Sequence, residues 1–143
     1  MSRSASPVQL LLVEDDEVDV VAIQRAFRSM RILNPLAVAR DGIDALELLR
    51  GENGREALPR PYLILLDIRM PRMNGLEFLD VVRGDPKLRD SVVFVLTTSK
   101  HDEDITAAYR NNIAGYILKE TVGDDFIRLV SLLEAYWKIV ELP

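Results

Sequence analysis

The most informative stretch of the chain is residues 62–75, which read YLILLDIRMPRMNG. Its first five residues are apolar on both faces, a pattern typical of a strand buried inside a parallel sheet. Asp67 follows directly, and in open α/β sheets the functional side chains lie at the carboxyl ends of the strands. Pro71 and Gly75 then mark a loop. Asp67 is therefore a candidate functional residue, and the alternative is that it only caps a turn.

Strands and helices alternate on both sides of this stretch. Short apolar runs predict strands at residues 9–13, 36–39, 62–66, 92–96 and 115–118. Helical spacing of apolar residues predicts helices after each strand, and Asn74 with Glu77 forms a predicted capping box. Five alternations indicate an α/β fold with a doubly wound, five-stranded parallel sheet and helices on both faces. The predicted strand order is the flavodoxin-like order 2-1-3-4-5.

Length and composition limit the class of protein. A chain of 143 residues fits one domain, with a core from about residue 8 to residue 140. The net charge of −5 does not favour nucleic-acid binding, and the absence of cysteine excludes disulfides and thiolate chemistry. The apolar run at residues 10–13 is too short for a signal sequence or a membrane span. We therefore expect a cytoplasmic protein with no membrane or nucleic-acid partner.

Polar side chains follow four of the predicted strands. In the order 2-1-3-4-5 these strand ends lie side by side, so their side chains could meet in one shallow site. Clustered carboxylates repel each other unless a cation is present, and hard oxygen ligands suit Mg²⁺. Asp67 is then a candidate nucleophile that could form an aspartyl phosphate. The candidates are Glu14, Asp15 and Asp16 after the first strand, Asp67 after the third, Thr97 and Thr98 after the fourth, and Lys119 after the fifth.

Four segments in order resemble the receiver domain of two-component response regulators across almost the whole chain. The separations between the segments also match that family. The matching segments are residues 11–16 (LLVEDD), 66–75 (LDIRMPRMNG), 95–99 (VLTTS) and 116–119 (YILK).

The resemblance implies a role for each matching residue. Asp67 resembles the phosphoacceptor that takes a phosphoryl group from a sensor histidine kinase. Mg²⁺ is the implied cofactor. Glu14 and Asp15 resemble the acidic pair of the metal site, with Asp15 as the direct ligand, and Asp67 belongs to the same implied metal site. Asp16 is expected next to the site rather than in it. The implied roles of the remaining residues are these: the Arg69 main-chain carbonyl as a further metal ligand, Thr97 as the switch hydroxyl, Tyr116 as the switch aromatic, Lys119 as the phosphate-contacting lysine, and Arg69, Ser99 and Thr98 as tuning positions.

Three features indicate which group of receiver domains the chain resembles. Glu120 stands where most receivers have a proline after the lysine, the loop at residues 51–61 is longer than in compact receivers, and the chain ends in Glu-Leu-Pro. These features resemble the single-domain regulators that serve bacterial phytochrome kinases. A bacterial phytochrome is therefore the expected histidine kinase.

The expected output is protein contact or phosphorelay through a phosphotransfer protein, since no output domain is expected. Phosphorylation is expected to change the face formed by the fourth helix at residues 102–111, the fifth strand and the last helix. Leu132, Tyr136 and Ile139 lie off the main apolar stripe of that last helix, so we expect a homodimer through this region. The chain is not expected to be an enzyme beyond its own phosphorylation and dephosphorylation.

Other classes remain as alternatives. A phosphate-independent interaction module on a receiver fold would keep the fold without the chemistry. A haloacid-dehalogenase-like phosphatase also uses an aspartate nucleophile, but it needs a second acid where this chain has Arg69. A flavodoxin-like electron carrier needs a glycine- and hydroxyl-rich loop after the first strand, where this chain has acids.

Overall fold

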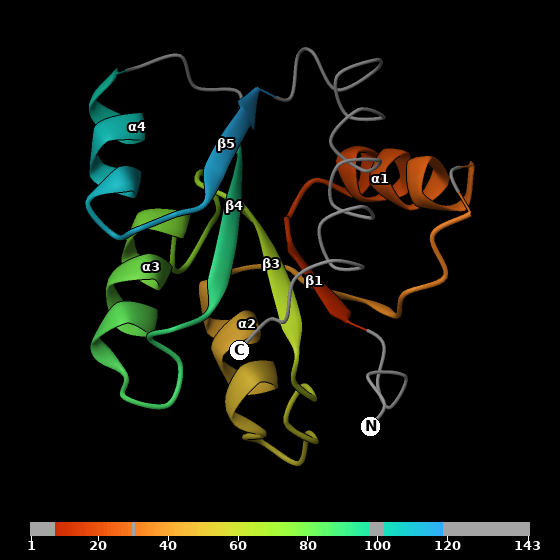
Figure 1. Cartoon of the computed structure of the whole chain (residues 1–143), viewed down its shortest axis with the longest axis horizontal. Coiled ribbons are helices and arrows are strands. Elements are labelled where there is room, and N and C mark those ends of the chain that lie inside the picture. Colours follow the sequence, from red (N-terminus) through yellow and green to blue (C-terminus); the bar gives the residue numbers. More distant parts are fainter. Residues whose placement is uncertain (1–7, 30, 98–101, 119–143) are drawn as a thin grey trace, which may run out of the picture.

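The computed structural model describes residues 8–29, 31–97 and 102–118. Strands and helices alternate along this part of the chain (Figure 1). The strands are β1 (Gln9–Val13), β2 (Leu36–Ala39), β3 (Tyr62–Asp67), β4 (Val92–Thr97) and β5 (Gly115–Leu118), and the helices are α1 (Glu17–Ser29), α2 (Gly42–Arg50), α3 (Gly75–Gly84) and α4 (Asp102–Tyr109). The predicted last helix lies outside the described residues.

The five strands form one parallel sheet in the order β2-β1-β3-β4-β5, which confirms the predicted topology. Strand β3 lies at the centre, and all six of its residues are buried. A strand covered on both faces has no polar side to show, which explains its uninterrupted apolar run.

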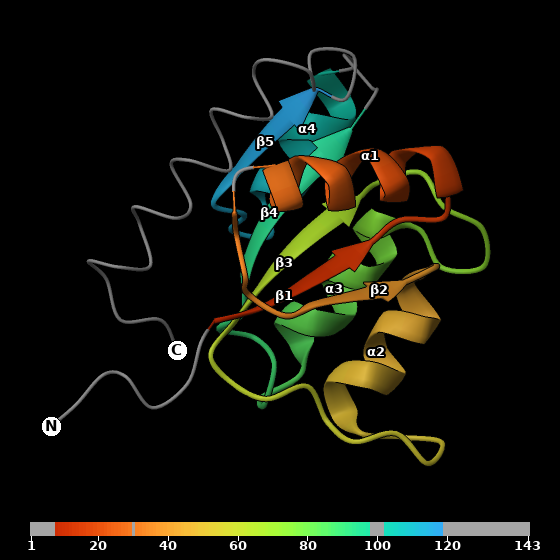
Figure 2. The ribbon, with the colours of Figure 1, turned by 90° about the vertical axis from the view of Figure 1, so that its right-hand side faces the viewer.

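Helices cover both faces of the sheet, with α1 on one side and α2, α3 and α4 on the other (Figure 2). Side chains alternate between the two faces because successive residues of a strand point in opposite directions. In β1, Leu11 and Val13 belong to the core under α2 and α3, whereas Leu10 and Leu12 belong to the core under α1.

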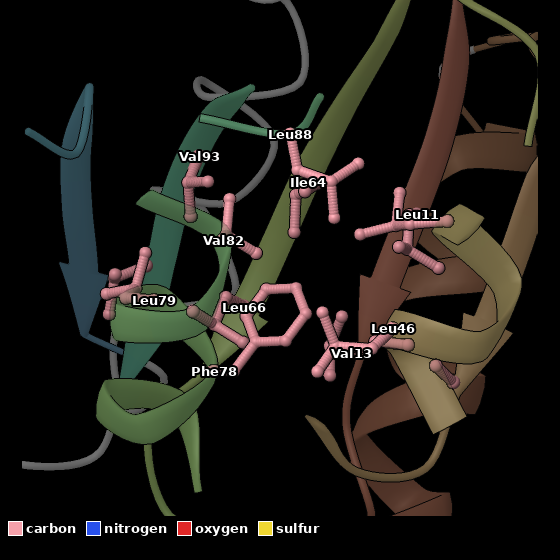
Figure 3. Packing of buried hydrophobic residues seen from close by; sticks show 14 of the residues in the cluster. Leu11, Val13, Leu46, Ile64, Leu66, Phe78, Leu79, Val82, Leu88 and Val93 are labelled. Carbon is pink, nitrogen blue, oxygen red and sulfur yellow. The ribbon is translucent and has the colours of Figure 1, made fainter. Parts of the chain in front are cut away.

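The core under α3 is built around Phe78, which is fully buried. Figure 3 shows its ring beside Leu66 of β3, with Leu79 and Val82 also directed from α3 toward the sheet. Asn74 caps this helix as predicted: its side chain accepts a hydrogen bond from Glu77 N, and the Glu77 side chain accepts one from Asn74 N. This packing fixes the helix that follows the Asp67 loop.

Arg83, near the end of α3, forms hydrogen bonds with the loop before β4 and the loop before β5. Its guanidinium donates hydrogen bonds to the main-chain carbonyls of Arg89, Ser91, Asn111 and Asn112, at 2.8, 2.7, 2.6 and 3.1 Å. Burial lowers the pKa of Arg83 from its ordinary value. The turn between α4 and β5 is therefore tied to α3 through one side chain.

The predicted boundaries differ from the structure by one or two residues. Strands β3 and β4 include Asp67 and Thr97, so these residues end the strands rather than follow them. Helix α4 ends at Tyr109 instead of residue 111, because Asn111 N and Asn112 N bond to carbonyls three residues earlier and Asn112 is left-handed. Such a tight turn cannot continue an α-helix.

Candidate functional site at the carboxyl edge of the sheet

The candidate site lies where β1 and β3 end next to each other. The register pairs Val13 with Leu66, so the next residue of each strand, Glu14 and Asp67, comes out at the same edge. Both residues are buried, with exposed fractions of 0% for Glu14 and 5% for Asp67. The predicted meeting of these two acids is a direct result of the parallel pairing.

Asp15 joins these two acids to form a carboxylate cluster. Glu14, Asp15 and Asp67 each offer one oxygen, and the three oxygens lie within 4.8 Å of one another. Asp15 is exposed, so the cluster is open to solvent on one side. Three hard oxygen donors fit Mg²⁺, which retains several waters and needs only one or two protein carboxylates. We call this set the carboxylate cluster below.

Asp16 does not belong to the carboxylate cluster. Its Oδ1 accepts hydrogen bonds from Val18 N at 2.9 Å and Asp19 N at 3.4 Å, and thereby caps the N-terminus of α1. Its own main-chain N–H donates to Glu14 Oε2 at 3.1 Å. The three successive acids therefore have different roles: Glu14 and Asp15 belong to the carboxylate cluster, and Asp16 caps α1.

The loop between Asp67 and α3 packs tightly against the end of β3. Gly75 N donates a hydrogen bond of 2.7 Å to Ile68 O. A Cβ atom at position 75 would lie 2.5 Å from the Asp67 carbonyl oxygen, so only glycine allows this approach. Arg69 is exposed in this loop. Its main-chain carbonyl as a metal ligand stays a prediction.

For the predicted phosphate contacts, Thr97 and Lys119, the structure gives only the pairing of the strands that lead to them. Asp67 pairs with Leu96 across β3 and β4, so Thr97 lies one residue beyond the partner of Asp67. Thr97 in turn pairs with Leu118, which directly precedes Lys119. The register therefore brings the Thr97 main chain to the edge of the sheet where Asp67 lies, and the role of Thr97 as a phosphate contact stays a prediction. Lys119, Thr98 and Ser99 themselves lie outside the described residues.

Tyr116 of β5 is accessible from solvent, with 40% of its surface exposed. Its ring packs edge to face against Tyr109 of α4, with centroids 6.1 Å apart and an interplanar angle of 86°. Such T-shaped pairs are a favourable arrangement of two aromatic rings. Its role as a switch aromatic is untested.

Two residues beside the site were missed from the sequence. Asp41 is 6% exposed, and Arg72 donates to it from Nε at 2.6 Å and from Nη2 at 3.1 Å. Burial opposes ionisation of Asp41, but the hydrogen bonds from Arg72 and the Asp44 main chain outweigh it and lower its pKa. Asp41-Gly42 gave only a turn signal in the sequence, and Arg72 gave none.

None of the helices in the described ranges is both long and apolar enough to span a membrane.

Comparison with known proteins agrees with this geometry. The response regulator receiver domain model matches residues 10–131. Response regulator Rcp1 from Synechocystis sp. is 35% identical over 142 residues, which cover 99% of this chain and 97% of Rcp1. The crystal structure of Mn²⁺-bound Rcp1 superposes with a TM-score of 0.82 and covers 96% of this chain and 99% of that chain.

A second solved structure, the phosphorylated cyanobacterial phytochrome response regulator RcpA, is 32% identical. It superposes with a TM-score of 0.84, over 96% of this chain and 99% of that chain. The strand order, the carboxylate cluster and these matches lead to one conclusion: the chain belongs to the response regulator receiver domain family, and it is related to the phytochrome response regulators.

Proposed function

We propose that this protein is a phosphorylation switch that accepts a phosphoryl group on Asp67 in a Mg²⁺-dependent reaction. The observation that carries the proposal is the carboxylate cluster, in which Glu14, Asp15 and Asp67 offer oxygens within 4.8 Å of one another. Glu14 and Asp15 would hold the cation, together with the main-chain carbonyl of Arg69. Asp67 would provide the nucleophilic oxygen.

In the proposed reaction, an Asp67 carboxylate oxygen attacks the phosphorus of a phosphohistidine. A P–O bond forms while the P–N bond breaks, and the kinase imidazole leaves with the electron pair. The bound cation would neutralise charge on the phosphoryl oxygens. The Thr97 hydroxyl and the Lys119 ammonium would contact those oxygens from the ends of β4 and β5. The protein thus promotes only its own phosphorylation and dephosphorylation.

The proposed kinase is a bacterial phytochrome located with this protein in the cytoplasm. Support comes from RcpA, a phytochrome response regulator whose structure is phosphorylated and which is similar over nearly the full length of this chain. Transfer of phosphate from a purified, autophosphorylated bacterial phytochrome should be faster than transfer from an unrelated histidine kinase. Equal rates from both kinases would contradict this choice of partner.

The proposed output is the face made by α4, β5 and the last predicted helix. The exposed Tyr109–Tyr116 pair lies on this face and could respond to events at Thr97, because β4 and β5 are paired at that end. We propose that this face forms a homodimer and signals by protein contact or through a phosphotransfer protein. A molar mass that stays monomeric with and without phosphate would count against the dimer.

The phosphoacceptor is tested by intact-protein mass after incubation with acetyl phosphate and Mg²⁺. One phosphoryl adduct is expected, lost with a chelator and lost in Asp67→Asn. Asp90→Asn, which removes an exposed aspartate after α3, is the matched control and should be labelled like the wild type. Labelling of Asp67→Asn at the wild-type level would refute Asp67 as acceptor. No adduct in any sample would favour a phosphate-independent interaction module.

A further inference from the structure

The segment at residues 68–74, which joins Asp67 to α3, is fastened to a distant part of the chain. Its partner is the turn between β2 and α2, at Asp41 and Gly42. Nothing in the proposed reaction uses these contacts. These contacts are nevertheless well-formed hydrogen bonds, and they hold the loop that includes the Arg69 carbonyl.

The first contact is the bidentate ion pair between Arg72 and Asp41. The two hydrogen bonds measure 2.6 Å to Oδ2 and 3.1 Å to Oδ1, an arrangement that fixes the relative orientation of both groups. The Asp41 side chain is 8% exposed, and its Oδ1 also accepts a hydrogen bond from Asp44 N at 2.8 Å. Asp41 therefore caps α2 and holds Arg72 with the same carboxylate.

The second contact is between main chains. Gly42 N donates a hydrogen bond of 3.1 Å to Met73 O. A Cβ atom at position 42 would lie 2.7 Å from Met73 Cγ, so the turn and the loop meet closely. Arg72 also has a φ of 60°, a left-handed conformation that is unfavourable for a residue with a side chain. Backbone strain of this kind persists only where surrounding contacts hold it in place.

The loop is fixed at its other end as well. Gly75 N bonds to Ile68 O at 2.7 Å, directly after Asp67. Residues 69–71 therefore span two anchored points, one at the end of β3 and one at the α2 turn. The position of the Arg69 carbonyl relative to the carboxylate cluster depends on both anchors.

We propose that the Asp41–Arg72 ion pair is a positioning device for the cation site: it holds the 68–74 loop so that the Arg69 carbonyl can complete the ligand set of the carboxylate cluster. This inference rests on the proposed function, because it requires Mg²⁺ at the cluster. Neither residue touches the cation in this scheme. The Arg72 side chain is 57% exposed, so replacing it with alanine removes the hydrogen bonds that orient the loop but little buried packing.

The test is the dissociation constant for Mg²⁺, measured by isothermal titration on the full chain. Mutating a residue that orients a metal ligand without binding the metal typically lowers metal affinity by about tenfold or more. We therefore expect Arg72→Ala to weaken Mg²⁺ binding about tenfold. Arg72→Lys should restore only part of it, because lysine cannot form the bidentate pair. Phosphorylation by acetyl phosphate should slow at low Mg²⁺ and approach the wild-type rate at saturating Mg²⁺.

The matched control is Arg55→Ala. Arg55, in the loop after α2, pairs with Asp44 of α2 at 2.5 Å, and its side chain is 39% exposed. This ion pair joins that loop to α2 and not to the 68–74 loop. This variant should bind Mg²⁺ like the wild type. An equal loss in Arg55→Ala and Arg72→Ala would overturn the proposal by pointing to a general effect on α2.

The failure of this inference is distinguishable from the failure of the proposed function. If the wild type binds Mg²⁺ and takes phosphate while Arg72→Ala does both equally well, the positioning role is wrong and the switch stands. If the wild type binds no Mg²⁺ and accepts no phosphate, both proposals are wrong. Thermal unfolding of each variant confirms that affinities are compared between folded proteins.

Discussion

Gly75 provides a sharp test of how closely α3 approaches the end of β3. In Gly75→Ala the new Cβ would lie 2.5 Å from the Asp67 carbonyl oxygen and 2.7 Å from the Ile68 Cα atom. Both are main-chain atoms at the end of β3, where Asp67 pairs with Leu96 of β4 and Ile68 O accepts a hydrogen bond from Gly75 N, so they cannot move aside easily. Overpacking costs about 1–3 kcal/mol, and the alanine regains about 0.5–1 kcal/mol through helix propensity. We place the clash at the upper end and expect a net loss of about 2 kcal/mol.

The measurement is urea unfolding at equilibrium. With an m-value of about 2 kcal/mol per molar urea, a loss of about 2 kcal/mol lowers the midpoint by about 1 M. Gly84→Ala, the same change at the other end of α3, is the control, because its added Cβ would meet nothing within 4 Å beyond the neighbouring residues and backbone of its own helix. Its midpoint should stay constant or rise. A Gly75→Ala midpoint equal to that of the wild type would refute the reasoning.

Two further predictions concern arginine contacts. Arg83→Ala removes the donor to four carbonyls and should lower the free energy of unfolding by about 2–3 kcal/mol, with little recovery in Arg83→Lys, as judged by urea midpoints. The pKa of Asp41 is lowered in the folded state, so its contribution is present above its ordinary value of 3.8 and is lost as pH falls through the folded pKa. The stability difference between the wild type and Asp41→Asn should therefore shrink in acid, and a constant difference would contradict this.

The sheet could be predicted from the sequence because its signals are local. Each strand is a short apolar run, and the right-handed crossover rule leaves few ways to arrange five such runs. Helix ends were predicted less accurately, because the hydrogen bonds that end a helix do not follow from the spacing of apolar residues. The end of α4 depends on Asn112 adopting a left-handed conformation, which no apolar pattern announces.

The carboxylate cluster could be predicted for a different reason. Glu14 and Asp67 each stand where an apolar run stops, and parallel pairing brings such positions to one edge. The resemblance already implied that Asp16 lies next to the site, but the sequence did not show that Glu14 is buried, Asp15 exposed and Asp16 the cap of α1. These differences depend on where β1 stops and α1 begins, to within one residue.

The Asp41–Arg72 pair illustrates what a sequence pattern cannot convey. Both residues lie in loops, where neither strand nor helix periodicity constrains a side chain, and their meeting depends on how α2 and the 68–74 loop pack. The sequence predicted a turn at this aspartate and glycine, and the structure adds that Asp41 caps α2. Its second role arises because the second oxygen of this buried carboxylate accepts a hydrogen bond from Arg72, which the fold places beside it. Contacts of this kind decide how firmly a site is held, so variants in them should change metal affinity while the order of the strands stays the same.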